Sequence, residues 1–222
     1  MTNGIFKGYI FDIDGTLTST NELIFASFNY VINKYLNKTL SNEEIISLFG
    51  PTEDVILREW LKDNYEEAKE DYYKFYRDNH SKLAKIVPGI EEIIREIKQN
   101  KIPLGIFTGK GKQSSLITLE ELGIVDYFDL IITGDDVKNH KPSPEGINLF
   151  LNKFNLPPES VLMIGDAPVD IKAAHDAKVK VAAVVWDSYA KEKVLDMEYD
   201  FLFHSPEELK VFISENIKKG RL

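Results

Sequence analysis

Residues 9–16 read YIFDIDGT: three apolar residues are followed at once by two aspartates that flank an isoleucine, and then by a glycine and a threonine. Similar short apolar runs recur at 103–107, 130–132, 161–164, 181–186 and 201–203. These runs are continuously apolar rather than alternating, which is typical of strands buried on both faces of a parallel sheet. Because amphipathic helical patterns separate them, the sequence predicts an α/β fold with a doubly wound, mainly parallel sheet.

One interval breaks this alternation. From about Asn21 to Lys85 no strand is evident, and apolar residues such as Leu23, Phe28 and Val31 recur at helical spacing. We therefore predict a helical cap over residues 16–86, inserted into an α/β core made of residues 1–15 and 87–222.

Composition narrows the function classes. The 222 residues contain 27 Lys and Arg against 36 Asp and Glu, a net charge of −9 that disfavours binding to nucleic-acid phosphates or anionic membranes. The absence of cysteine excludes disulfides, thiol nucleophiles and cysteine metal sites. Because neither a signal peptide nor an 18-residue apolar segment is evident, we expect a cytoplasmic protein with no nucleic-acid or membrane partner.

Polar residues follow the predicted strands, where open α/β sheets bind ligands. Asp12 and Asp14 follow the first strand, Thr108 the second, and Asp166 a later one, while Lys141 precedes a helix. Each has a simple alternative explanation: paired aspartates before glycine are typical of turns, and loop lysines are usually solvent-exposed. The ordered set at strand ends is more specific, and it predicts that these side chains converge.

The residue types indicate phosphoryl chemistry. Asp12 and Asp14 are two apart in an extended segment, so their side chains point the same way. Such carboxylates, with Asp166, suit Mg²⁺, and a carboxylate can attack phosphorus while a second one transfers protons. Lys141 and the Thr108 hydroxyl can neutralise charge and position a phosphoryl group. Residues 108–112 lack the Gly-Lys-Ser/Thr ending of a nucleotide-binding P-loop.

This set resembles the haloacid dehalogenase superfamily of phosphohydrolases, in its phosphoglycolate-phosphatase-like branch, over nearly the whole chain. Residues 11–17, Thr108, Lys141-Pro142 and 165–170 are similar to its four motifs. The resemblance implies that Asp12 is the nucleophile and Asp14 the general acid/base. It also implies that Thr108 binds the phosphoryl group and that Lys141 neutralises negative charge.

For the cofactor, the resemblance implies Mg²⁺ held by the Asp12 carboxylate, the Asp14 backbone carbonyl and Asp166. Asp170 is expected to orient the water shell of the ion rather than to bind it directly. The branch commonly has other residues at Ser19, Lys178 and Asp187, and these departures weaken any assignment to one subfamily.

The substrate is expected to be a small phosphorylated metabolite, and the protein a monomer or a homodimer. Gly109 and Lys110 are predicted to bind substrate with Thr108, and Gly50 and Thr52 to belong to a specificity loop in the cap. Arg58 could meet an anionic substrate end, but a solvated helix face is the favoured explanation. Two alternatives stay open. One is a phosphoryl transfer of the β-phosphoglucomutase type, against which Ile24 counts because that type has a cap histidine there. The other is a catalytically silent phosphate sensor.

Overall fold

A six-stranded parallel sheet organises the computed structural model, which describes residues 4–221. The strands lie in the order β5 (Leu130–Ile132), β4 (Leu104–Phe107), β1 (Gly8–Phe11), β6 (Val161–Gly165), β7 (Lys180–Val184) and β8 (Phe201–Phe203). All residues of β1, β4 and β6 are buried, as their continuously apolar sequences predict. The predicted fold class is confirmed, with β7 ending at Val184 rather than at Trp186.

Strand β1 occupies the centre of this sheet. Its last residue, Phe11, pairs with Ile106 of β4 on one side and with Ile164 of β6 on the other. Successive side chains of a strand point to opposite faces, so Phe11 joins the hydrophobic core on one face and Ile10 the core on the other. The end of β1 is therefore the point where the strand order reverses, which is where such sheets bind ligands.

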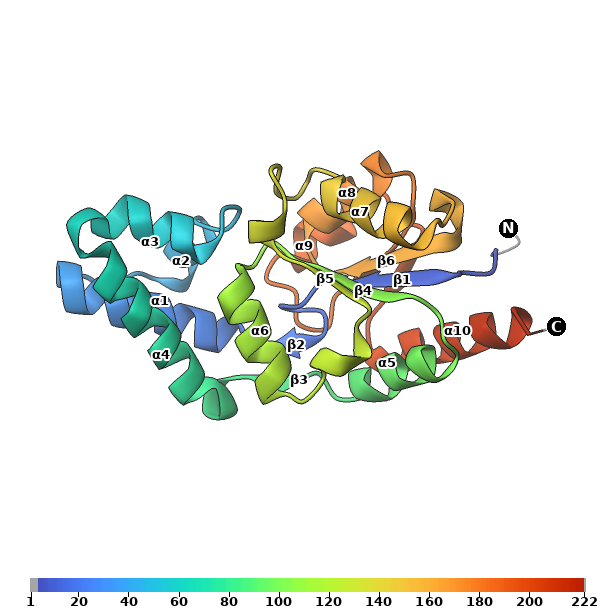
Figure 1. Ribbon diagram of the computed structural model, residues 1–222, viewed down its shortest axis with the longest axis horizontal. Helices are drawn as coiled ribbons and strands as arrows, with labels where there is room; N and C mark the ends of the chain where they lie inside the picture. The colour runs from blue at the N-terminus through green and yellow to red at the C-terminus, as the bar shows by residue number, and fades with distance from the viewer. Residues whose placement is uncertain (1–3, 222) are drawn as a thin grey trace.

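Helices cover both faces of the sheet (Figure 1). One face packs against α5 (Ile90–Gln99) and α10 (Pro206–Lys219), and the other against α7 (Glu145–Phe154), α8 (Pro168–Asp176) and α9 (Lys191–Leu195). Short 3₁₀ helices cover Lys62–Asn64, Val125–Tyr127, Gly134–Asp136 and Pro158–Ser160. Within residues 4–221, no helix combines the length and apolarity needed to cross a bilayer.

Four further helices form a separate group at one end of the molecule (Figure 1). They are α1 (Asn21–Leu36), α2 (Asn42–Ile46), α3 (Glu53–Leu61) and α4 (Tyr65–Leu83). Their apolar faces enclose a third hydrophobic cluster, which Ile117 of α6 (Lys112–Glu121) also joins. Residues 21–83, whose apolar residues recur at helical spacing, therefore form a helical layer with its own hydrophobic core. We call this layer the cap.

A two-stranded ribbon lies where the chain enters and leaves the cap. Strand β2 (Thr18–Ser19) pairs antiparallel with β3 (Lys85–Ile86). The prediction of no strand up to Lys85 is wrong at that residue, because β3 begins there. Two-residue strands carry no readable periodicity, and this pairing depends on residues more than sixty positions apart. The predicted boundaries at 15/16 and 86/87 stay predictions, and the ribbon lies just inside them.

Candidate active site

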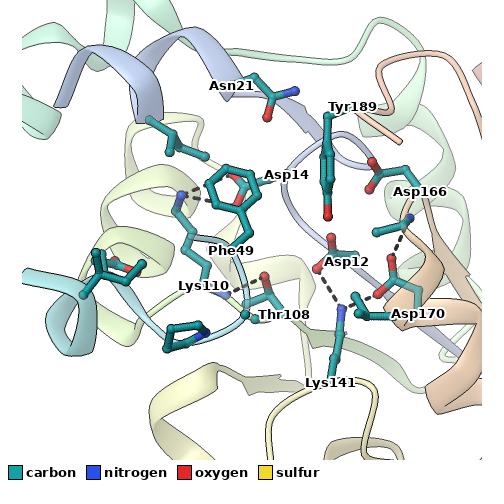
Figure 2. A pocket seen from close by; sticks show the side chains of 18 of the residues that line it. Asp12, Asp14, Asn21, Phe49, Thr108, Lys110, Lys141, Asp166, Asp170 and Tyr189 are labelled. Carbon is teal, nitrogen blue, oxygen red and sulfur yellow. Dashed lines mark hydrogen bonds and ion pairs between the residues drawn. The ribbon is translucent and has the colours of Figure 1, made fainter. Parts of the chain in front are cut away.

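The carboxyl ends of the three central strands meet at one cavity. Asp12 follows β1, Thr108 follows β4, and Asp166 follows β6. Because these strands are parallel neighbours, their polar end residues are brought together, as predicted. With Asp14, Lys110, Lys141, Asp170 and residues of the cap, they line a cavity of about 150 Å³ (Figure 2).

Asp12 is buried at the base of this cavity beside a lysine. The Lys141 Nζ lies 2.9 Å from Asp12 Oδ1 and 2.6 Å from Asp170 Oδ1, so one ammonium group bridges two carboxylates (Figure 2). Burial raises the pKa of Asp12 to about 6, and Lys141 opposes this rise while Asp170 and Asp14 add to it. Burial acts to lower the pKa of Lys141, but the two aspartates overcome it and hold that pKa above its usual value.

Asp166 leaves one oxygen without a partner. Its Oδ1 accepts a hydrogen bond from the Thr16 hydroxyl at 3.1 Å, whereas its buried Oδ2 has no hydrogen-bond donor within the described part of the chain. Burial, followed by the charges of Asp12 and Asp170, raises the pKa of Asp166 well above its usual value. A buried carboxylate in this state needs either a proton or a cation.

Three carboxylates are close enough to share a cation. Oxygens of Asp12, Asp166 and Asp170 lie within 4.8 Å of one another. Asp170 is already engaged, since one oxygen accepts from Lys141 and the other from the Ala167 amide at 3.0 Å. The unpartnered Asp166 Oδ2 and the Asp12 carboxylate therefore fit a hard cation such as Mg²⁺ better than Asp170 does. The predicted role of the Asp14 backbone carbonyl stays a prediction.

Gly15 makes room for Asp166. Its φ of +78° lies in the left-handed region, and a Cβ built there would lie 2.4 Å from Asp166 Oδ2. A side chain at position 15 would therefore be strained and would displace the carboxylate. The need for space beside Asp166 thus explains why position 15 of the DIDGT segment is a glycine.

The expectation that the Asp12 and Asp14 side chains point the same way is wrong, because Asp14 points away from Asp12 toward a second lysine. The Lys110 Nζ lies 3.2 Å from both carboxylate oxygens of Asp14 (Figure 2). The Thr20 hydroxyl donates to the same carboxylate. The ammonium group also lies 4.9 Å from the centre of the Tyr76 ring in the cap. Burial acts to lower the pKa of Lys110, but the Asp14 charge overrides it and holds that pKa above its usual value. Lys110, which was predicted to bind substrate, is thus paired with Asp14 in this structure.

The other predicted substrate residues divide into two groups. Thr108, Gly109 and Gly50 line the cavity, and the Thr108 hydroxyl accepts a hydrogen bond from the Lys110 amide at 3.3 Å. Thr52 is buried but lies outside the lining, with its methyl group against Gly134. Arg58 is likewise outside the lining.

Several lining residues escaped the sequence prediction, among them Phe49, Glu53 and Tyr189. Phe49 of the cap and Tyr189 of the loop after β7 meet edge to face at 5.5 Å between ring centres (Figure 2). Glu53, the first residue of α3, accepts hydrogen bonds from the Gly111 amide at 2.9 Å and from the Ser114 hydroxyl. In sequence, Glu53 resembles any acidic residue in a first helical turn, which the helix dipole favours. No local signal marks it as a residue of the cavity.

Comparison with known proteins agrees with this geometry. The family model for haloacid dehalogenase-like hydrolases matches residues 9–184, most of the chain. The chain belongs to the haloacid dehalogenase-like hydrolases. Within this enzyme family, the chain is 32% identical over 205 residues to the pyrophosphatase PpaX of Bacillus cereus, a match that covers 92% of this chain and 95% of that protein.

Two solved structures share this fold. A predicted phosphoglycolate phosphatase from Haemophilus somnus is 24% identical, with a TM-score of 0.79 over 93% of this chain and 98% of that one. The protein CbbY from Rhodobacter sphaeroides, solved with phosphate, is 22% identical, with a TM-score of 0.78 over 92% and 96% of the two chains. At these identities the likeness concerns the fold, and it agrees with the sheet and cap seen here.

Proposed function

We propose that this hydrolase is a Mg²⁺-dependent phosphatase that acts on small phosphomonoesters through an aspartyl-phosphate intermediate. The observation that carries the proposal is the buried pair of Asp12 and Lys141, 2.9 Å apart, beside the unpartnered carboxylate oxygen of Asp166. Asp12 can serve as the nucleophile, the Lys141 ammonium group can neutralise the phosphoryl oxygens, and Asp166 Oδ2 can bind a cation. All three groups line the same cavity. The family membership and its phosphatase-named relatives agree with this assignment.

The residues would divide the reaction into two steps. A carboxylate oxygen of Asp12 attacks phosphorus, and the ester P–O bond breaks as the Asp14 carboxyl gives its proton to the leaving oxygen. Water then attacks the phosphorus of the aspartyl phosphate while Asp14 takes a proton from it. The acyl-phosphate P–O bond breaks, which releases inorganic phosphate and restores Asp12.

The remaining side chains bind and orient the phosphoryl group. The Thr108 hydroxyl and the backbone amide of Gly109 line the cavity next to Asp12 and supply hydrogen-bond donors. Lys141 neutralises charge that builds up between Asp12 and the phosphoryl oxygens. Mg²⁺, held by Asp12 and Asp166 with the Asp14 carbonyl, would supply further charge neutralisation of the phosphoryl group.

A mutase reaction of the β-phosphoglucomutase type has less support. Ile24 lines the cavity from the cap helix α1, and its side chain can neither donate nor accept a proton. The cap therefore lacks at that position the imidazole that the resemblance associates with mutases.

Hydrolysis of p-nitrophenyl phosphate with MgCl₂ tests the proposal. We expect turnover that EDTA abolishes and that Asp12→Asn removes. Asp176→Asn is the matched control, because Asp176 is an exposed residue at the end of α8. Full activity of Asp12→Asn, or equal loss in both variants, would contradict the role of Asp12 as nucleophile. Silence of the wild-type protein across a broad panel of phosphate esters would favour the sensor alternative.

A further inference from the structure

The part of the cavity that would hold the leaving group is built by the cap and is mostly apolar. Its side chains come from α1, the segment after α2, α3 and α4, and they include Ile24, Phe28, Phe49, Ile56 and Tyr72. Apart from tyrosine hydroxyls, the polar side chains that the cap contributes to the lining are Asn21 and Glu53. The one charged group on this wall, among the residues that the structure describes, is thus a carboxylate.

Glu53 is held rigidly in that wall. Its side chain is buried, and its oxygens accept from the Gly111 amide and the Ser114 hydroxyl at the start of the core helix α6. Gly111 gives the carboxylate its space, because a Cβ there would lie about 3 Å from all three carboxylate atoms. A carboxylate fixed at a helix N-terminus cannot turn away to accommodate a second anion.

No lysine of the lining is free to compensate for an anionic leaving group. Lys110 is paired with both oxygens of Asp14, and Lys141 bridges Asp12 and Asp170. Arg58 is the arginine of α3. It is exposed, lies over the Tyr65 ring at 4.3 Å from the ring centre, and does not line the cavity. A second negative charge on the substrate would therefore be desolvated beside Glu53 without a counterion.

We propose that Glu53 is a specificity-determining residue that selects against leaving groups carrying negative charge. The preferred substrates are then phosphomonoesters whose leaving group is uncharged and largely apolar. This inference rests on the phosphatase activity proposed above and narrows its substrate class. It separates this chain from its relative named a pyrophosphatase, because pyrophosphate has an anionic leaving group.

A pair of substrates that differ in charge alone tests the inference. Phosphoglycolate and its neutral amide have nearly the same shape, and phenyl phosphate and pyrophosphate extend the comparison. For the wild-type enzyme we expect kcat/KM to be at least about tenfold higher for the amide than for phosphoglycolate, and lowest for pyrophosphate. Equal values, or a preference for phosphoglycolate or pyrophosphate, would overturn the inference while leaving the phosphatase activity intact. Hydrolysis of none of the four esters would instead count against the proposed function.

Variants assign the selectivity to Glu53. Glu53→Gln keeps an oxygen for the Gly111 amide and an NH₂ group that can donate to Ser114, so it removes the charge with little change of shape. We expect it to reduce the amide-to-phosphoglycolate ratio about tenfold. Asp54→Asn is the matched control, since Asp54 contacts Lys69 and Tyr73 outside the lining. An unchanged ratio in Glu53→Gln, or the same change in both variants, would overturn the assignment. The amide-to-phosphoglycolate ratio of the wild-type enzyme tests the inference even if a variant does not fold.

Discussion

Lys110 and Asp14 form an ion pair within the candidate active-site cavity, with Nζ 3.2 Å from each carboxylate oxygen. The lysine side chain is nearly buried, and Tyr76 of the cap covers the ammonium group. This pairing holds the proposed acid/base in a position that depends on both the core and the cap. It also explains why a lysine at this place need not be a substrate ligand.

Removing Lys110 should therefore affect both stability and turnover. Lys110→Met would leave Asp14 without its counterion, and we expect the free energy of unfolding to fall by about 1–3 kcal/mol. We also expect kcat to fall, because the Asp14 carboxyl loses its orientation. Urea denaturation and steady-state hydrolysis measure the two effects. Lys112→Met is the control, since its exposed pair with Asp136 should contribute at most about 1 kcal/mol. Equal effects of the two substitutions would contradict the role of Lys110.

Asp14→Asn should slow breakdown of the phosphoenzyme while Mg²⁺ still binds. The amide cannot take a proton from the attacking water, but the backbone carbonyl that is proposed to contact the ion is retained. Acid quenching should show phosphorylated protein accumulating, and calorimetry should show nearly unchanged Mg²⁺ affinity. Loss of Mg²⁺ binding in this variant would contradict the proposed backbone contact.

The metal-free protein should lose stability as the pH rises from about 4 to about 6. Burial raises the pKa of folded Asp12 to about 6, above the value of about 3.9 for an unfolded aspartate. Between these values the folded state binds more protons than the unfolded state, so stability decreases with rising pH. Asp166 acts in the same direction. Other titrating groups also contribute to the dependence of stability on pH. The change in stability on adding Mg²⁺ is therefore a more specific test of these aspartates than the pH dependence alone.

Mg²⁺ is proposed to bind the deprotonated carboxylates, so it should relieve this destabilisation. We expect the rise in Tm on adding MgCl₂ to be larger at about pH 7.5 than at about pH 5. Thermal unfolding with and without the ion at the two pH values checks it. An equal or larger rise at the lower pH would show that protons do not compete with the ion at these aspartates.

Two aspartates of the same cluster should respond oppositely to neutralisation. Asp166→Asn removes a buried charge that has no counterion, so the metal-free variant should be at least as stable as the wild type, while its response to Mg²⁺ disappears. Asp170→Asn breaks a buried pair with Lys141, and we expect a loss of about 3 kcal/mol. Denaturation without metal compares the two. Destabilisation of equal size would mean that Asp166 is satisfied in the folded protein.

The strands and their polar end residues could be predicted because their signals are local. A strand buried on both faces is a short, continuously apolar run, and the polar residue that ends it marks the edge of the sheet. Asp12, Thr108 and Asp166 were found in this way. The ribbon of β2 and β3 could not be, because two-residue strands form only when chain segments more than sixty residues apart meet. Thr52 likewise lies two residues from Gly50, yet of these two residues only Gly50 lines the cavity.

By itself, the sequence predicted the fold class, the helical stretches between residues 21 and 83 and the polar residues at the strand ends, since each depends on periodicity or on spacing within one segment. The tertiary structure alone decided which charges meet: Lys110 with Asp14, Lys141 between Asp12 and Asp170, and Glu53 with the start of α6. These pairs join residues 29 to 129 positions apart, and no local pattern encodes such a distance. Electrostatic partners are chosen by packing, because a charge interacts with whatever the fold places within a few ångströms of it.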